Sequence, residues 1–126
     1  MKEADFTRYI MGKLPSEIYK WKIMNMMQNG VPDCYFSGSH GDLWVEVKYR
    51  NAPKRDNTKF KADLSELQNK WLTDRSNEGR NVAVILGTDA GCRIFDRNDW
   101  SIPIEKSDLI HTKQDIVEWI CQQTLG

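Results

Sequence analysis

Residues 82–86 form an unbroken apolar run, Val-Ala-Val-Ile-Leu, and Gly87 closes it. A strand with one face in water alternates apolar and polar residues, whereas a strand covered on both faces is apolar throughout. The run therefore predicts a buried strand in a sheet that has helices on both sides. The chain has 126 residues, a length that suits a single domain over residues 1–126.

A helix and a pair of strands are predicted in the first 50 residues. Apolar residues at helical spacing favour a first helix over residues 14–28, with Pro15 in its first turn and Asn29-Gly30 as its stop signal. Residues 34–36 and 43–49 have strand composition, and the segment between them has turn chemistry. We therefore expect these two strands to pair as a β-hairpin.

The remaining elements follow from the same patterns. A second helix is expected from Leu64 to about residue 77, a short strand over residues 92–95, and a last helix behind a Thr112 N-cap. The predicted order is α-β-β-α-β-β-α, which indicates an α/β fold with a mixed sheet flanked by helices. Three tryptophans fall on apolar helix faces and are predicted to be core residues: Trp21, Trp71 and Trp119.

The charged residues balance at 18 basic and 18 acidic, so the net charge by itself predicts no polyanionic partner. Residues 48–61 are the exception, because they hold six basic residues and only one acid, Asp56. Loop-forming residues surround these charges, which predicts a mobile basic loop that could follow phosphates. A solvated loop with a chance excess of lysine is the alternative. The candidate nucleic-acid contacts are Arg50, Lys54, Arg55, Lys59 and Lys61.

The three cysteines lie far apart and form no C-x-x-C pair. We expect reduced thiols rather than a zinc site, because an odd number cannot pair completely within one chain. No apolar run approaches the ~18 residues of a membrane span, and the first residues lack the apolar stretch of a signal peptide. The expected location is the cytoplasm, without a membrane partner.

The most informative polar residues are Asp33, which follows Pro32, and the Glu46-Val47-Lys48 triplet of the second hairpin strand. Alternation along a strand places Glu46 and Lys48 on one face and Val47 on the other. Hairpin pairing would set Asp33 opposite Glu46. Two close carboxylates repel unless a cation intervenes, so the pair favours a hard divalent ion such as Mg²⁺. With a lysine beside it, such a site suits phosphodiester hydrolysis.

Each of these features also has an ordinary structural explanation. Pro32-Asp33 at a strand entrance is often only a turn, and Glu46 with Lys48 is often a solvent-facing ion pair. However, residues 43–45 that precede Glu46 are apolar. A strand that starts buried and then places two charges on one face suggests a partly shielded cleft.

The order of the motifs resembles the VRR-NUC branch of the PD-(D/E)XK nucleases, in particular its small stand-alone members of phage or bacterial type. The resemblance covers about residues 14–88. It rests on the motifs Gly-Val-Pro-Asp at 30–33, Trp-Val-Glu-Val-Lys at 44–48, Leu-Ser-Glu-Leu-Gln at 64–68 and Gly-Arg-Asn-Val-Ala-Val at 79–84. It implies a restriction-endonuclease-like α/β core and a nuclease that depends on Mg²⁺ or Mn²⁺.

The same resemblance assigns roles to individual residues. Asp33, Glu46 and the Val47 carbonyl would be metal ligands, and Lys48 would be the catalytic lysine. Since small stand-alone members resemble Holliday-junction resolvases that act as homodimers, branched DNA and a homodimer are the implied substrate and assembly.

Two further residues fit the family pattern but have competing interpretations. Gln68 matches the family's glutamine near the metal and water, yet the spacing from Ser65 is also that of a helix capping box. Glu17 fits the place of a glutamate in the first helix that helps to bind metal or water; a first-turn acid stabilised by the helix dipole is the equal alternative.

The favoured function is a metal-dependent endonuclease acting on DNA, with branched DNA preferred. A second hypothesis is a non-catalytic nucleic-acid-binding module, or an adaptor or inhibitor, on a nuclease fold. A third is an RNA-directed nuclease with the same chemistry, since the preference for DNA rests on analogy.

Overall fold

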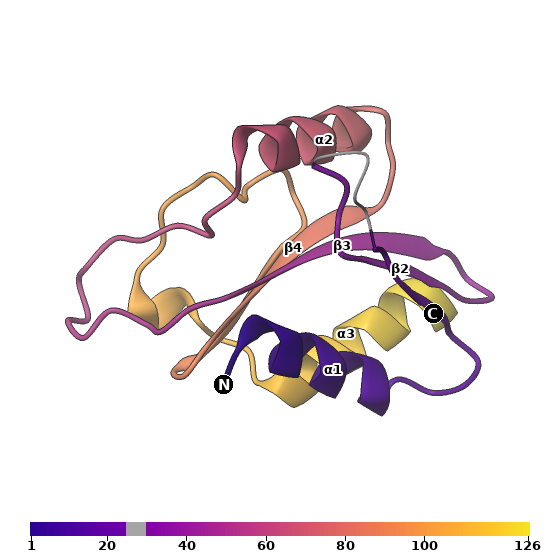
Figure 1. Ribbon diagram of the computed structural model, residues 1–126, viewed down its shortest axis with the longest axis horizontal. Coiled ribbons are helices and arrows are strands. Elements are labelled where there is room, and N and C mark those ends of the chain that lie inside the picture. The colour runs from indigo at the N-terminus through magenta and orange to yellow at the C-terminus, as the bar shows by residue number, and fades with distance from the viewer. Residues whose placement is uncertain (25–29) are drawn as a thin grey trace.

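The computed structural model describes residues 1–24 and 30–126. Its centre is a mixed sheet in the spatial order β1-β2-β3-β4-β5, in which β3 and β4 are parallel and all other neighbours are antiparallel (Figure 1). The strands are β1 (Tyr19–Lys22), β2 (Cys34–Ser37), β3 (Asp42–Tyr49), β4 (Val82–Thr88) and β5 (Gly91–Phe95).

Helices cover both faces of the sheet (Figure 1). Helices α1 (Glu3–Lys13) and α3 (Lys113–Leu125) pack on one face, over a core that includes Phe6 and Ile120. Helix α2 (Glu66–Asn77) lies on the other face and connects the parallel strands β3 and β4, which cannot be joined by a tight turn. A short 3₁₀ helix, η1 (Lys106–Asp108), precedes α3.

Strand β4 is buried along its whole length, as its apolar run predicts. The strand continues to Thr88, so Gly87 lies inside it instead of closing it. Gly87 is needed there because the Phe6 ring packs directly on its backbone: a Cβ at this position would lie 2.7 Å from the ring. Phe6 thereby holds α1 against the sheet.

Replacing Gly87 with alanine is expected to lower the free energy of unfolding by about 1–3 kcal/mol, because the added methyl overpacks the contact between Phe6 and Tyr49. Urea denaturation measures the change. Gly12→Ala is the matched control: a Cβ at this position in α1 meets nothing within 4 Å, so we expect a gain of about 0.5–1 kcal/mol. Equal stability of Gly87→Ala and wild type would contradict the close packing.

The prediction of a first helix over residues 14–28 is wrong for the described residues. The helix runs instead from Glu3 to Lys13, and Leu14 is extended because the residue before a proline avoids the helical region. Pro15 therefore ends a helix and does not begin one. Strand β1 follows after a turn, and residues 25–29 of the predicted helix lie outside the described residues.

The observed order, α-β-β-β-α-β-β-α with η1 before the last helix, thus has one more strand than expected. Trp21 lies on β1 and is 47% exposed, so its predicted core position is wrong. Trp71 and Trp119 are partly buried against the two cores.

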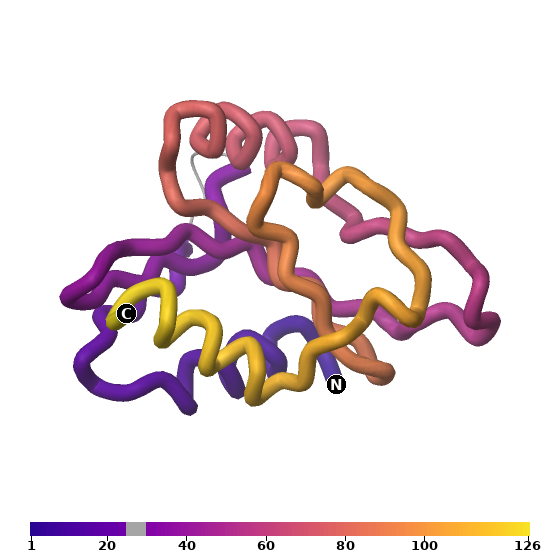
Figure 2. Tube along the Cα trace, turned by 180° about the vertical axis from the view of Figure 1, so that it is seen from behind, coloured from indigo at the N-terminus to yellow at the C-terminus, as the bar shows by residue number. Residues whose placement is uncertain are grey.

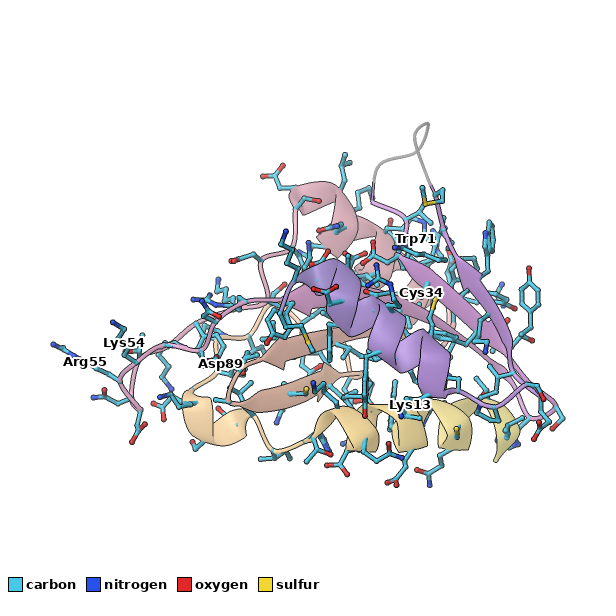
Figure 3. All side chains as sticks on the ribbon, turned by 60° about the horizontal axis from the view of Figure 1, so that its bottom comes forward. Lys13, Cys34, Lys54, Arg55, Trp71 and Asp89 are labelled. Carbon is cyan, nitrogen blue, oxygen red and sulfur yellow. The ribbon has the colours of Figure 1, made fainter. Side chains whose placement is uncertain are left out.

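The basic loop projects from the molecule but is anchored at several points, so the prediction of a mobile loop is not supported. Figure 3 shows Lys54 and Arg55 at its tip. Phe60 exchanges backbone hydrogen bonds of 2.9 and 2.8 Å with Ile104, and in Figure 2 the two segments run side by side. Further links join Ala52 N to Asp89 Oδ1 (2.7 Å), Lys59 to Glu105 (3.2 Å) and Lys106 to Asp56 (3.6 Å).

The cysteines are free thiols, with Cys34 and Cys92 buried and Cys121 partly buried. Among the described residues, no helix is long and apolar enough to cross a bilayer.

Candidate active site

The two predicted carboxylates meet where β2 begins beside β3. The hairpin register pairs Cys34 with Val45, which places Asp33 opposite Glu46. Asp33 is held there by a hydrogen bond of 3.0 Å, in which the Val47 backbone N–H donates to Asp33 Oδ2. Hairpin pairing therefore brings together two acids that are 13 positions apart in the sequence.

Lys48 lies on the same face of β3 as Glu46. Its Nζ is 3.6 Å from Glu46 Oε2, and its side chain is about 20% exposed. Val45 and Val47 point into the core under α1 and α3, as alternation predicts. Since Lys48 remains partly accessible while its carboxylate partner is buried, its ammonium group can reach a ligand at the mouth of the site.

Gln68 forms the predicted helix cap and also reaches Glu46. Its backbone N–H donates to Ser65 Oγ (3.1 Å), and its side-chain Oε1 accepts from the Ser65 backbone N–H (2.9 Å), which completes a capping box at the start of α2. The other end of the same amide, Nε2, donates to Glu46 Oε2 (3.1 Å). The cap thus aims the amide at the carboxylate.

Glu46 is the unusual residue of this group, because it is a carboxylate that is only 2% exposed. Its Oε2 interacts with Gln68 and Lys48, whereas its buried Oε1 has no hydrogen-bond partner among the described residues. Burial, followed by the neighbouring Asp33 carboxylate, raises the pKa of Glu46 to about 8, against the opposing effect of the Lys48 ammonium. The single charge of Lys48 therefore does not compensate the two neighbouring carboxylates.

A hard divalent cation fits this deficit. The carboxylate oxygens of Asp33 and Glu46 and the carbonyl oxygen of Val47 would coordinate it. That carbonyl points toward Asp33, because the N–H and C=O of one strand residue face the same neighbouring strand and the Val47 N–H already binds Asp33. No group of three or more His, Cys, Asp or Glu suited to a metal occurs among the described residues, so a backbone carbonyl and water would complete the shell.

The structure does not bring Glu17 to this group. Glu17 is exposed in the turn after α1, outside any helix, and its carboxylate accepts from Ser16 Oγ (3.0 Å). Its charge acts on Cys121 of α3, whose pKa is raised by burial and then by Glu118 and Glu17. The expectation that Glu17 occupies the first helix is therefore wrong.

Glu3 takes that place instead, in the first turn of α1. Burial, followed by the Asp33 carboxylate, raises the pKa of Glu3, while Lys48 and the Tyr49 backbone N–H act in the opposite direction. Glu3 is exposed at the start of α1, and the charges of Asp33 and Lys48 act on its carboxylate there. The sequence signal was available: Phe6 and Ile10 have helical spacing behind the two first-turn acids Glu3 and Asp5.

Comparisons with known proteins bear on the fold. No protein-family model matches the chain, and no curated protein matches it. A solved structure does match: the Holliday junction resolvase Hjc from the archaeal hyperthermophile Archaeoglobus fulgidus, with a TM-score of 0.64, 19% sequence identity, and coverage of 93% of this chain and 98% of the resolvase chain.

The chain therefore shares the fold of that solved structure. The predicted restriction-endonuclease-like fold class, a mixed sheet flanked by helices, is thereby confirmed. Within this fold, the hairpin and the start of α2 converge on one place, and each supplies a polar group to it.

The predicted nucleic-acid contacts lie along the loop that leaves β3 just after Lys48. Arg50 stacks over the Phe60 ring (5.1 Å) and approaches Asp63 (4.0 Å), and Lys59 pairs with Glu105. Lys54, Arg55 and Lys61 are exposed. The loop therefore carries exposed positive charges and begins at the end of β3, next to the two acids.

Proposed function

We propose that residues 1–126 form a nuclease domain that hydrolyses phosphodiester bonds in DNA with Mg²⁺ or Mn²⁺, in the manner of a Holliday-junction resolvase. One observation carries the proposal. A buried carboxylate with an unpartnered oxygen, Glu46, lies opposite a second acid and 3.6 Å from a lysine. The likeness in fold to a Holliday junction resolvase supports it, as does the basic loop that follows β3 directly after these groups.

The residues would divide the chemistry as follows. Asp33, Glu46 and the Val47 carbonyl would hold the ion, which when bound lowers the pKa of a water and neutralises phosphate charge. Lys48 would stabilise negative charge that develops on the scissile phosphate. Gln68 would keep Glu46 oriented through its Nε2–H, because its own position is set by the cap on Ser65.

The direct test is cleavage of a synthetic four-way DNA junction in Mg²⁺ and in Mn²⁺, with the arms of the junction as linear duplex controls. We expect strand cleavage that a chelator abolishes and that is faster on the junction than on the duplex. Cleavage of an RNA analogue at the same rate would redirect the proposal to RNA. No cleavage of any of these substrates would reject the nuclease.

A second candidate function is a non-catalytic nucleic-acid-binding module, or an adaptor or inhibitor, on the same fold. The zero net charge favours it, since long-range attraction to DNA is then weak. Calorimetry separates the two. Binding of Mn²⁺ that is lost in Asp33→Asn supports the enzyme, and no metal binding by the wild-type protein supports the module.

Glu3 and Glu17 provide a matched pair of variants. We expect Glu3→Gln to lower the cleavage rate about 10-fold or more, because its charge acts on Asp33 and Lys48 and outer partners of metal ligands typically contribute 10–100-fold. Glu17→Gln should cleave at the wild-type rate. Junction cleavage under single-turnover conditions measures both, and a loss in Glu17→Gln with none in Glu3→Gln would reverse the assignment.

Branch specificity leads to the proposed assembly. Symmetric cutting of two strands needs two active sites, whereas one chain carries a single Asp33–Glu46 pair, so we propose a homodimer. Separately, the order of the motifs in residues 30–84 supports membership in the VRR-NUC family. Sedimentation equilibrium tests the homodimer, and a monomer at the concentrations that resolve junctions would contradict it.

A further inference from the structure

Aromatic side chains cross one face of the sheet from its free edge to α2. The ring centroids of Tyr19 and Tyr35 are 6.5 Å apart, those of Tyr35 and Trp44 4.6 Å, and those of Trp44 and Trp71 5.4 Å. Trp21 belongs to the same row, because it is the cross-strand partner of Tyr35. We call the row the aromatic shelf: Tyr19, Trp21, Tyr35, Trp44 and Trp71.

The shelf is exposed to solvent at the edge strand β1 and covered at its other end by helix α2. Tyr19 and Trp21 on β1 are 61% and 47% exposed, whereas Trp71 closes the other end from α2. Figure 3 shows Trp71 on the α2 side of the sheet. Tyr35 is fixed in orientation by its hydroxyl, which donates to Asp42 Oδ2 (2.7 Å). The rings are therefore held in place while two of them face solvent.

The shelf begins next to the candidate active site. Tyr35 lies two residues after Asp33 on one strand, and Trp44 lies two residues before Glu46 on the other, so each aromatic shares a strand face with one of the acids. Two residues along a strand span about 7 Å. A strand of DNA with a phosphate at the acids would have its next nucleotides over these rings.

The position of the shelf indicates which partner fits. Lys20 and Lys22 alternate with Tyr19 and Trp21, so they point to the opposite face of the edge strand, where Lys20 Nζ approaches the Leu14 carbonyl (3.4 Å). The shelf face itself therefore presents aromatic rings beside the two acids, and exposed rings of this kind stack unpaired bases of single strands. A packing role in the core does not explain Trp21, because about half of its surface remains in solvent.

We propose that the open end of the aromatic shelf stacks unpaired nucleobases next to the scissile phosphate. The inference rests on the proposed nuclease function and extends it, because it defines the substrate as DNA with unpaired nucleotides beside the cut. Trp21 and Tyr19 would receive the bases, and Tyr35 and Trp44 would support them. Stacking tolerates any base, so the preference would be for unpaired structure and not for a sequence.

Binding of a short fluorescent oligothymidylate tests the proposal, measured by anisotropy in a chelator so that no strand is cut. The comparison strand is an abasic oligonucleotide of equal length, which keeps the phosphates and lacks the bases. We expect wild-type protein to bind the thymidylate about 5- to 100-fold more tightly than the abasic strand, and Trp21→Ala to lose most of this ratio. Trp21→Phe should retain much of it.

Ile110→Ala is the matched control, since Ile110 is an apolar residue outside the shelf that is 65% exposed. Its ratio should equal that of the wild type. Equal binding of the thymidylate and abasic strands by the wild-type protein would overturn the proposal without any variant. The proposal would also be overturned if Trp21→Ala kept the wild-type ratio of thymidylate to abasic affinity but changed from dimer to monomer. The shelf would then be a self-association surface.

The outcomes separate this inference from the proposed function. Base-dependent binding without metal-dependent cleavage would retain the shelf as a binding site and reject the nuclease. Junction cleavage with equal binding of both strands would retain the nuclease and reject the shelf.

Discussion

Replacing Lys48 with alanine is expected to lower the single-turnover rate of junction cleavage by about 10²–10³-fold, the usual cost of removing one group that stabilises transition-state charge. The reason is its position: the Lys48 ammonium lies 3.6 Å from Glu46 Oε2 and remains partly accessible at the mouth of the site. Affinity for Mn²⁺ should persist, because Lys48 is not a proposed ligand. Quenched-flow cleavage and calorimetry measure the two quantities.

The matched control for this variant is Lys70→Ala. Lys70 lies on α2, is exposed, and pairs with Asp74 (2.9 Å), so its removal should leave cleavage within about twofold of wild type, as is usual for an exposed ion pair. Circular dichroism shows whether both variants are folded. Wild-type cleavage by a folded Lys48→Ala protein would refute the role of this lysine.

Replacing Glu46 with glutamine is expected to have opposite effects on the metal-free and metal-bound protein. In the metal-free protein, burial and then Asp33 raise the pKa of Glu46 from an ordinary 4.5 to about 8. The folded state therefore holds a proton that the unfolded state has released. The contribution of this group to stability is complete below pH 4.5 and is lost as the pH rises through about 8.

Glutamine stays neutral at every pH and can still accept the Gln68 Nε2–H. At pH 8.5 without metal, we expect Glu46→Gln to be more stable than wild type by about 1–3 kcal/mol, the cost of a buried unsatisfied polar group. Near pH 4.5 the difference should vanish. Saturating Mg²⁺ should reverse the order, since a ligand at 100 times its Kd adds about 2.7 kcal/mol to the protein that binds it.

Urea denaturation at the two pH values, with and without Mg²⁺, measures these differences. Asp42→Asn is a suitable control, because Asp42 lies on the same strand as Glu46 but is exposed and accepts from Tyr35. If Mg²⁺ stabilised Glu46→Gln as strongly as wild type, Glu46 would not be a ligand. A metal-free Glu46→Gln protein less stable than wild type at pH 8.5 would show that the buried charge is compensated.

The arrangement of Asp33, Glu46 and Lys48 could be anticipated because it depends on local rules. Alternation along a strand and the register of a hairpin decide which side chains share a face, and both follow from short stretches of sequence. The dual role of Gln68 was harder to foresee. Its spacing from Ser65 predicted the cap, but only the crossover of α2 over the sheet directs the free end of the amide at Glu46.

The N-terminal region shows where local pattern was insufficient. Leu14 and Ile18 are buried as a helical pattern predicts, yet they lie in a turn that enters an edge strand. The same spacing is compatible with either outcome, and the conformational limit that Pro15 places on Leu14 decided between them. The error in helix position is also what placed Glu17 in the first helix, where the structure has Glu3.

The sequence by itself determined the buried central strand, the hairpin that pairs two acids, and the position of Lys48 beside them, because each depends on residues close in the chain. Only the tertiary structure decided that the charge of Asp33 acts on Glu3, that Gln68 reaches Glu46, and that Tyr19, Trp21, Tyr35, Trp44 and Trp71 form one row. Those neighbours are set by the packing of helices on a sheet and by pairing at its edge. Such long-range contacts leave no periodic signal in a single sequence.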